Sequence, residues 1–232
     1  MALMHDVNFC LPIPQELENE RVKLVAFAPA EHADAFFTGA NESLYTHLPW
    51  GPFSTAAEFR ASFGPHVNPD PSRLIFAVLD KTTADAPQLA GTIGFMNTLP
   101  AHLSTEIGCV ITLPRFQRTH VTANGVGLLL HLALDAPAEG GFGLRRVVWQ
   151  TNALNTASMR AAERLGFRHE GVLRWDHILR PGKAANRVDV PLRAGDPKPD
   201  GPGTDTMVYS LCWDDWEGGA REAVDTVMQR TT

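Results

Sequence analysis

The sequence predicts an α+β protein, and three observations support this fold class. Strand-like segments at 74–79, 89–96 and 105–113 are joined by short polar turns, which is typical of an antiparallel meander. The next segment, 121–134, is apolar nearly all round and predicts a deeply buried helix. A second helix, 155–165, then lies between a strand at 147–150 and a strand at 171–178. Sheet and helices therefore have to share one core.

Composition limits the class of protein further. With 232 residues, 44% of them hydrophobic, the chain suits one large domain or two small ones. No apolar run approaches the ~18–20 residues of a membrane helix, and residues 1–9 lack the pattern of a signal peptide. Three scattered cysteines, Cys10, Cys109 and Cys212, favour a reducing cytoplasmic location. The nine histidines form no HxxxH or HExxH pair, so no metal site is expected.

Charge is unevenly distributed along the chain. The net charge of −6 argues against a general nucleic-acid binder. The segment 106–180 holds nine arginines, no lysine and six acids, which gives +3 and leaves −9 for the remainder. A positive centre between acidic flanks favours a central anionic ligand and a cationic second partner, and solvated surfaces of uneven charge are the alternative.

The first third of the chain predicts a lead-in followed by a strand and two helices. Residues 1–19 contain two prolines and are expected to be irregular. Alternation predicts a strand at 21–27, and helical spacing of apolar residues predicts a helix at 30–40. A turn-rich stretch, 44–53, precedes a helix that Ser54 is expected to cap and that runs to Phe63.

The last third predicts a long hairpin. Segments 171–178 and 207–213 have strand character, and 180–205 between them holds five prolines and four glycines. We interpret 180–205 as an insertion that is either a lid over a site or exposed surface. The expected organisation is one domain over 20–221, with a C-terminal tail at 222–232.

Two helix starts follow strands and carry the candidate chemistry. The buried helix begins after Pro114, and Arg115, Arg118, Thr119 and Thr122 surround its N-terminus. Free N–H groups and the positive end of the helix dipole predict a phosphate site there, with a solvated basic rim as the alternative. At the second helix, Asn155 fits the N-cap and Gly166 fits the left-handed position after the last turn.

The order and spacing of these pieces resemble the GNAT superfamily of acetyl-CoA-dependent N-acetyltransferases, most closely its RimJ/RimL-like branch of ribosomal-protein N-terminal acetyltransferases. The resemblance rests on GTIGF at 91–95, EIGCVI at 106–111, PRFQRTHVTANGVGLLL at 114–130, NALNTASMRAAERLGFRHEGVLR at 152–174 and DTMVYSLCWDDW at 205–216. It covers about Glu20 to Arg221. It implies a mixed, mostly antiparallel sheet that is splayed open near its middle and has helices on both faces.

The resemblance also implies where acetyl-CoA binds. Pantetheine would pair with the strand end Ile111–Leu113, Asn152 and Asn155 would hold its amides, and Arg160 would reach the adenosine phosphates. The pyrophosphate would sit on the next helix start, at Gln117, Arg118, Thr119, His120, Val121 and Thr122. The family's loop reads Q/RxxGxG/A, so His120 and Thr122 occupy the glycine positions, and their side chains narrow the approach of a phosphate.

Acetyl transfer needs a base, a group for the oxyanion and a hydrogen bond for the leaving sulfur. A backbone N–H at a bulge near 110–112 would serve the oxyanion, and Glu106 is the candidate base, unless it is only a strand-end glutamate facing solvent. The tyrosine that many relatives use as an acid is replaced by Ala162, whereas Ser158 matches the serine used in the RimJ/RimL-like branch. A serine that only satisfies the backbone at the helix start is the alternative role for Ser158. Asp176 or His177 would face the acceptor, and free histidine titrates near ~6.5, which suits a base.

The acceptor is predicted less sharply than the donor. Tyr45, His47, Trp50 and Phe53 fall in the region that walls the acceptor site in similar proteins, although aromatic residues there also serve as core. The expected function is acetyl transfer from acetyl-CoA to a primary amine, either a protein N-terminus or a small molecule, by direct attack in a ternary complex. The chain would act as a monomer or homodimer. A catalytically inactive acyl-CoA-binding protein and an α/β scaffold for protein partners are the alternatives.

Overall fold

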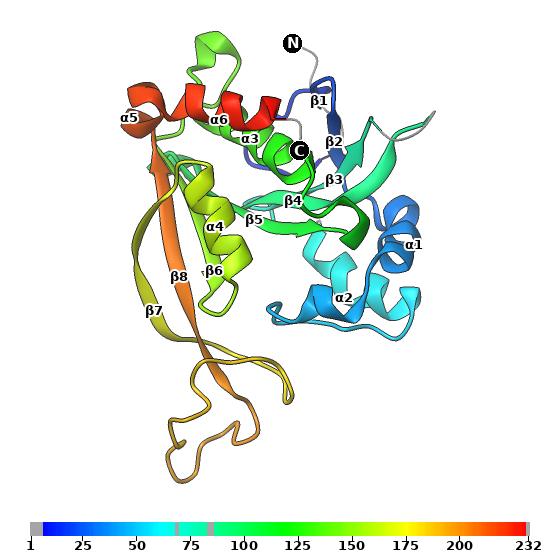
Figure 1. Ribbon diagram of the computed structural model, residues 1–232, viewed down its shortest axis with the longest axis vertical. Coiled ribbons are helices and arrows are strands. Elements are labelled where there is room, and N and C mark those ends of the chain that lie inside the picture. Colours follow the sequence, from blue (N-terminus) through cyan, green and yellow to red (C-terminus); the bar gives the residue numbers. More distant parts are fainter. Residues whose placement is uncertain (1–6, 68–69, 83–85, 231–232) are drawn as a thin grey trace.

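The computed structural model describes residues 7–67, 70–82 and 86–230. In this part of the chain eight strands form one sheet in the order β1-β2-β3-β4-β5-β6-β8-β7 (Figure 1). Neighbouring strands are antiparallel except for the parallel pair β5–β6. The strands are β1 (Leu17–Glu18), β2 (Val22–Ala26), β3 (Leu74–Asp80), β4 (Gln88–Leu99), β5 (Ser104–Thr112), β6 (Arg146–Asn152), β7 (Arg168–Ile178) and β8 (Gly203–Cys212).

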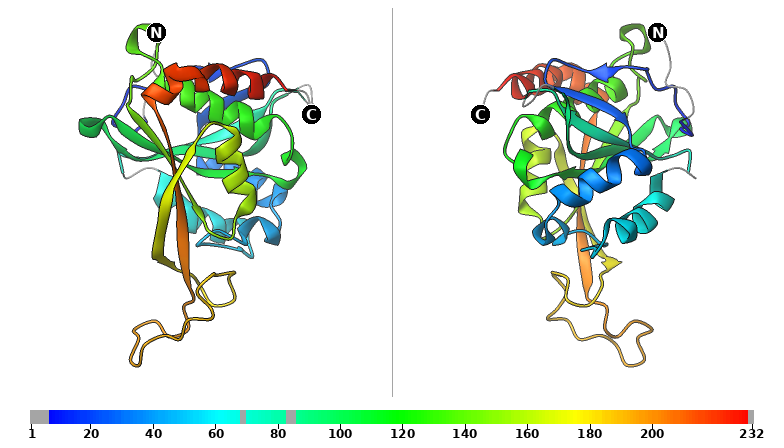
Figure 2. Two further views of the ribbon diagram at one scale, coloured as in Figure 1. Left: turned by 60° about the vertical axis from the view of Figure 1, so that its left-hand side comes forward. Right: turned by 90° about the vertical axis from the view of Figure 1, so that its right-hand side faces the viewer.

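Helices cover both faces of this sheet. The α-helices are α1 (Pro29–Gly39), α2 (Ala56–Val67), α3 (Val121–Leu134), α4 (Thr156–Arg164), α5 (Trp213–Asp215) and α6 (Arg221–Gln229), with short 3-10 turns at Glu42–Tyr45 and Pro114–Phe116. Helix α3 lies across β2 to β6, while α1 packs against α2 and β4 (Figure 2). Strand β3 is consequently buried on both faces, as its continuous apolar run predicts. The α+β fold class and the meander β3–β4–β5 are confirmed.

The sheet opens between β5 and β6. The two strands pair only at Ser104–Arg146, Thr105–Val147 and Glu106–Val148, and then diverge. Just beyond the last pair, Cys109 and Val110 stand where β4 supplies a single residue, and Cys109 has φ +50°. This is a β-bulge, which bends the strand and interrupts its pairing. We call the space between the diverging strands the wedge, and the predicted splay of the sheet is confirmed.

Helix α4 carries the end signals that the sequence indicates. The Asn155 side chain accepts a hydrogen bond from the Ser158 N–H at 3.1 Å, which satisfies a free donor of the first turn. Gly166 has φ +87°, and the N–H of Phe167 returns to the Ala162 carbonyl at 3.1 Å. These bonds form a Schellman-type C-terminus that needs a residue in the left-handed region.

Both ends of the chain are more ordered than expected. Leu17 and Glu18 form β1 against β2, within the lead-in that was expected to be irregular. The region expected to be a tail contains α6, which packs on α3 through Val224 and Val227. Both are placed by long-range packing that short sequence patterns do not reveal. At α2, Thr55 rather than Ser54 caps the helix, since its hydroxyl accepts the Glu58 N–H at 3.1 Å.

The β7–β8 hairpin extends beyond the body of the protein and carries the Pro/Gly-rich insertion at its tip (Figure 1). The insertion is tied at its base by Asp205, which is buried on β8. Its carboxylate pairs with Arg187 at 2.6 Å and accepts hydrogen bonds from the Asn186 side chain and the Trp175 N–H. We call residues 179–202 the arm.

In the part of the chain that the structure describes, no helix combines the length and the apolar character needed to cross a membrane.

Replacing Val224 by Ala should lower the free energy of unfolding by about 2 kcal/mol, because the side chain is 1% exposed and its removal leaves a cavity under α6. Urea unfolding would measure it. Thr226→Ala, on the exposed side of the same helix, should change stability by less than about 0.5 kcal/mol. Equal, negligible effects of both substitutions would mean that residues 221–229 behave as a solvated tail.

Candidate active site

A cavity of about 360 Å³ occupies the wedge. Its walls come from the end of β5, from β6, from the start of α4, from the loop 47–50 and from the neck of the β7–β8 hairpin. The lining includes His47, Trp50, Asn97, Glu106, Cys109, Ile111, Trp149, Gln150, Asn152, Asn155, Ser158, His177 and Thr206. The residues predicted to act as base and as acid, and three of the predicted pantetheine ligands (Ile111, Asn152 and Asn155), therefore line one space.

Glu106 lies at the last paired position of β5, where the wedge begins. Its carboxylate accepts hydrogen bonds from Asn97 of β4 at 2.8 Å and Gln150 of β6 at 3.2 Å. Burial raises the pKa of Glu106 above its ordinary value, and these two bonds counteract the rise only in part. The carboxyl group is thus fixed at the narrow end of the wedge, with a proton affinity closer to that needed for general base catalysis near neutral pH.

Ser158 lies in the first turn of α4 and faces the cavity. Its hydroxyl oxygen accepts a hydrogen bond from the indole N–H of Trp149 on β6 at 3.0 Å. The backbone N–H of Ser158 is used by the Asn155 cap, so the hydroxyl itself is not needed for capping. The side chain can therefore donate its own proton in another direction.

His177 reaches the cavity from β7, downstream of a bulge in which Trp175 has φ +56°. Its Nδ1 lies 2.7 Å from a carboxylate oxygen of Asp176. The same oxygen accepts a hydrogen bond from Thr206 at 2.7 Å. Because a carboxylate only accepts, Nδ1 is the donor in this pair, and in a neutral imidazole Nε2 is then the nitrogen with the free lone pair. Asp176 was expected to face the acceptor, but it does not line the cavity and instead orients His177.

Asn152 and Asn155 lie at the opposite wall of the wedge. The side-chain oxygen Oδ1 of Asn152 accepts the Leu154 N–H at 2.8 Å, whereas the side-chain nitrogen Nδ2 is buried and has no partner among the described residues. A buried donor without a partner costs free energy unless a ligand satisfies it. This wall therefore fits a ligand that brings a carbonyl or amide oxygen, as pantetheine does.

In the predicted phosphate loop, fewer side chains are free to contact a phosphate than expected. His120 turns to the buried Asp80, with 3.0 Å between Nε2 and Oδ1. Thr122 bonds to Thr112 at 2.7 Å, and the Thr119 hydroxyl caps the backbone N–H of Val121 at 3.3 Å. A pyrophosphate at this helix start would therefore be held mainly by backbone N–H groups of α3, as the sequence predicts.

The two arginines that the sequence predicts as phosphate ligands, Arg118 and Arg160, are both exposed. Arg118 is exposed beside the start of α3 and has φ +62°, while Gln117 is used by the Thr112 carbonyl. Arg160 is exposed on α4. Neither arginine lines the cavity, which ends near Ile111. Leu113 is buried and borders a more open cavity of about 450 Å³ beside α1 instead of the wedge.

The acceptor side of the wedge is formed by the loop that follows Tyr45. His47 and Trp50 line the cavity, while Tyr45 is buried and stacks edge-on against Trp50 and Phe53 at 5.8 and 5.6 Å between ring centroids. Tyr45 and Phe53 therefore pack behind the residues that line the cavity and do not line it themselves. Burial lowers the pKa of His47, whose Nδ1 has no partner among the described residues.

The arm holds this loop in place. Lys183 donates hydrogen bonds from its ammonium group to the carbonyls of Tyr45 at 2.6 Å and Trp50 at 3.1 Å. The base of the arm therefore supports the loop that carries His47 and Trp50. Residues 188–194 are exposed and lie beyond it.

Cys109 lies at the bulge and lines the cavity. Burial raises the pKa of this thiol to about 11. A thiol with such a pKa is almost wholly protonated near neutral pH and is therefore a poor nucleophile. A covalent acyl-cysteine at this position is disfavoured.

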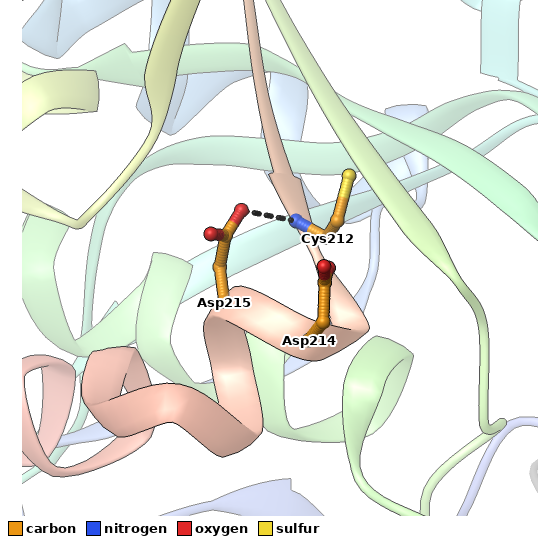
Figure 3. Close-up of side chains that lie close together, drawn as sticks. All are labelled: Cys212, Asp214 and Asp215. Carbon is orange, nitrogen blue, oxygen red and sulfur yellow. Dashed lines mark hydrogen bonds between the residues drawn. The ribbon is translucent and has the colours of Figure 1, made fainter.

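One group of possible metal ligands occurs among the described residues, at the end of β8 and outside the lining of the cavity (Figure 3). It consists of Cys212, Asp214 and Asp215, with ligand atoms within 4.8 Å of one another. The Asp215 carboxylate already pairs with Arg168 at 2.6 Å and accepts the Cys212 N–H at 3.4 Å. The cluster is explained by capping of α5.

Sequence reasoning did not identify Asn97, Trp149 or Gln150 as parts of the site. Trp149 and Gln150 belong to the strand that the sequence predicts at 147–150, so their place in that strand is the signal that could have identified them. Their partners lie on other elements, however, and only the fold shows that Gln150 meets Glu106 and Trp149 meets Ser158.

The sheet opens between two parallel strands and holds a cavity in the opening. Comparison with known proteins shows which family shares this arrangement. The profile of the family described as "Acetyltransferase (GNAT) domain" matches residues 21–168. No curated protein matches the chain significantly.

Solved structures show the same fold. A GCN5-related N-acetyltransferase from Brucella melitensis superposes with a TM-score of 0.74 at 25% identity, covering 92% of this chain and 85% of that one. A probable GNAT-family acetyltransferase from Chromobacterium violaceum has a TM-score of 0.68 at 26% identity, covering 87% and 93%. A spermidine N-acetyltransferase from Vibrio cholerae, solved with CoA and spermine, shares the fold at 15% identity, with a TM-score of 0.60 and coverage of 86% and 99%.

The chain belongs to the GNAT acetyltransferase family.

Alkylation of Cys109 by iodoacetamide should be slow at neutral pH and should rise about tenfold per pH unit between pH 7 and 9.5 without levelling off, because its pKa is about 11. Peptide mapping by mass spectrometry would follow the modification. In urea the same thiol should level off near its ordinary pKa of ~8.5. A plateau near that value in the folded protein would contradict a buried, protonated thiol.

Proposed function

We propose that the protein transfers an acetyl group from acetyl-CoA to a primary amine by direct attack in a ternary complex. The observation that carries the proposal is the wedge, where β5 and β6 stop pairing after Glu106 and the cavity between them gathers Glu106, Ser158 and His177. Acetyl-CoA, when bound, supplies the thioester whose carbonyl carbon the amine attacks. The protonated Cys109 supports direct transfer over a covalent acyl-enzyme.

Pantetheine fits the wedge as an added strand along Ile111, because β6 has left that edge of β5 free of a neighbour. The unpartnered amide of Asn152 would donate to one of its carbonyls. The pyrophosphate would rest on the first N–H groups of α3, with the exposed Arg118 of the preceding loop as a cation beside it. The positive dipole end of a 14-residue buried helix favours such an anion.

Deprotonation of the amine is assigned to Glu106 or His177. Glu106 is held at the narrow end of the wedge with a raised pKa. His177 is oriented by Asp176 so that its free nitrogen can take a proton. The bulge at Cys109–Val110 leaves backbone groups outside the regular pairing with β4, and one of their N–H groups would hold the carbonyl oxygen as charge develops on it.

The acceptor is proposed to be cationic before it reacts. The acceptor end of the cavity combines the Trp50 ring with the Glu106 carboxylate, a combination that attracts an ammonium group. A protein N-terminus, as in the RimJ/RimL-like branch, and a small-molecule amine both meet this description. The solved relative crystallised with CoA and spermine shows that this fold accommodates a polyamine in another protein.

An acyl-CoA-binding protein without turnover is the second candidate. It is favoured by the loop before α3, where His120 and Thr122 replace small residues and turn to Asp80 and Thr112. Calorimetry with CoA followed by thiol release over an amine panel separates the two, since a pure binder titrates but releases no thiol. The panel should hold spermidine, a peptide with a free N-terminus, and its N-acetylated form as a blank.

Replacing Arg118 by Glu should weaken the binding of CoA at least tenfold, because it reverses a charge beside the proposed pyrophosphate position. Isothermal titration calorimetry measures the affinity. Arg115→Glu is the matched control, since Arg115 stacks over Phe116 beside the other cavity and should change affinity little. Equal affinities for the wild type and Arg118→Glu would place the phosphates elsewhere.

Glu106→Gln should lower kcat about 100-fold if the carboxylate is the base. Its raised pKa also predicts that wild-type turnover falls as the pH drops through that value, and that Glu106→Gln lacks this acid limb. His177→Ala tests the other base in the same assay, and Glu217→Gln, exposed and far from the wedge, is the control. Full turnover in both Glu106→Gln and His177→Ala would remove both assignments.

A further inference from the structure

Trp149 occupies an unusual position for a buried aromatic residue. Its side chain is 2% exposed and packs edge-on against Phe167 with 5.6 Å between ring centroids, as a core residue does. One edge of the indole nevertheless reaches the cavity, where its N–H meets the Ser158 hydroxyl at 3.0 Å. Among the described residues this is the one side-chain hydrogen bond to the Ser158 oxygen.

In the hydrogen bond between Trp149 and Ser158, the chemistry of the two groups decides which is the donor and which is the acceptor. An indole N–H can only donate, so the serine oxygen must accept and its own proton must point elsewhere. A hydroxyl oxygen that accepts a hydrogen bond becomes a better donor, because hydrogen bonds in a chain polarise one another. Trp149 therefore both orients the serine proton and strengthens it as a donor.

A purely structural role would also bring the indole N–H to some acceptor, since buried tryptophans usually find one. Two features favour more than that. The acceptor is a half-buried side chain on the cavity wall, and Ser158 is not otherwise engaged, because Asn155 caps α4 through the backbone. The rigid ring, fixed on its other side by Phe167, holds the serine rotamer toward the wedge.

We infer that Trp149 is a positioning residue that aims the Ser158 hydroxyl at the leaving sulfur, an inference that rests on the proposed acetyl transfer. In that reaction a C–N bond forms and the C–S bond breaks, and the electron pair of the broken bond goes to sulfur. The proton of the amine goes to the base in the wedge. Ser158 keeps its proton and donates a hydrogen bond to the developing thiolate, and Trp149 keeps that donor aligned.

The contact is tested first in the free protein by NMR. The indole N–H resonance of Trp149, identified as the one missing in Trp149→Phe among the five tryptophans, should move on Ser158→Ala. The loss of its acceptor is expected to shift it to lower proton frequency. An unmoved resonance overturns the inference. Should Trp149→Phe fail to fold, assignment through the backbone replaces it.

Kinetics then test the role. Trp149→Phe keeps an aromatic ring against Phe167 and should lower kcat about tenfold while leaving the KM for acetyl-CoA within twofold, because one transition-state hydrogen bond is misaligned. In a Ser158→Ala background the same change should have less than a twofold effect. A tenfold loss that persists in that background, or no loss at all with Ser158 present, overturns the inference.

The control is Trp216→Phe, which removes an indole N–H bond to Asp135 at the far end of α3. It should reduce stability without changing kcat. If the wild type turns over no amine of the panel, the proposed transfer fails, whereas the NMR measurement still decides whether Trp149 aligns Ser158.

Discussion

Strands β5 and β6 share backbone pairing over three residues and no further, and the chemistry of the protein depends on where that pairing stops. Had the strands continued together, the backbone of β5 beyond Glu106 would be satisfied by β6 and no ligand could enter. Instead, a bulge at Cys109 turns β5 away, and Thr92 holds the bulge by donating to the Cys109 carbonyl at 2.9 Å. The free edge that remains can serve as the template for an extended ligand.

The two ends of the wedge differ in electrostatic character. The inner end is enclosed, so burial raises the pKa of Glu106 and Cys109 and favours neutral groups there. The outer end, at the start of α3, is exposed and offers a helix dipole with an arginine beside it. An anionic carrier that delivers an uncharged acyl group would encounter each environment at the matching part of its length. The free-energy cost of burying the negative charge of the carrier is thereby avoided where the reaction takes place.

Sequence patterns predicted the fold well because its main elements carry local signals. Helix α3 is apolar nearly all round, Asn155 and Gly166 mark the ends of α4, and β3 is a continuous apolar run. The short strand β1 and helix α6 escaped notice because their stability comes from partners distant in sequence, such as the pairing of β1 with β2 and the contact of Val224 with α3.

The candidate site was predicted by residue type more successfully than by role. Glu106, Ser158 and His177 were each picked from a strand end or helix start, and the fold brings them to one cavity. The roles of Asp176, His120 and Tyr45 depend instead on which partner each side chain meets. A carboxylate 2.7 Å from its neighbouring imidazole, or a histidine turned to Asp80, is a matter of rotamer and bulge geometry that spacing along the chain does not encode.

Lys183 makes the arm and the loop 45–50 a single mechanical unit, since one ammonium group bonds to two carbonyls of that loop. The loop proposed to cover the incoming amine is consequently held by an exposed hairpin, while the strands proposed to bind the donor belong to the central sheet. Under the proposed function, changes of length or sequence in the arm would alter which amines are admitted without disturbing the strands that bind the donor. Selectivity and chemistry are thus free to evolve at separate rates in this scaffold.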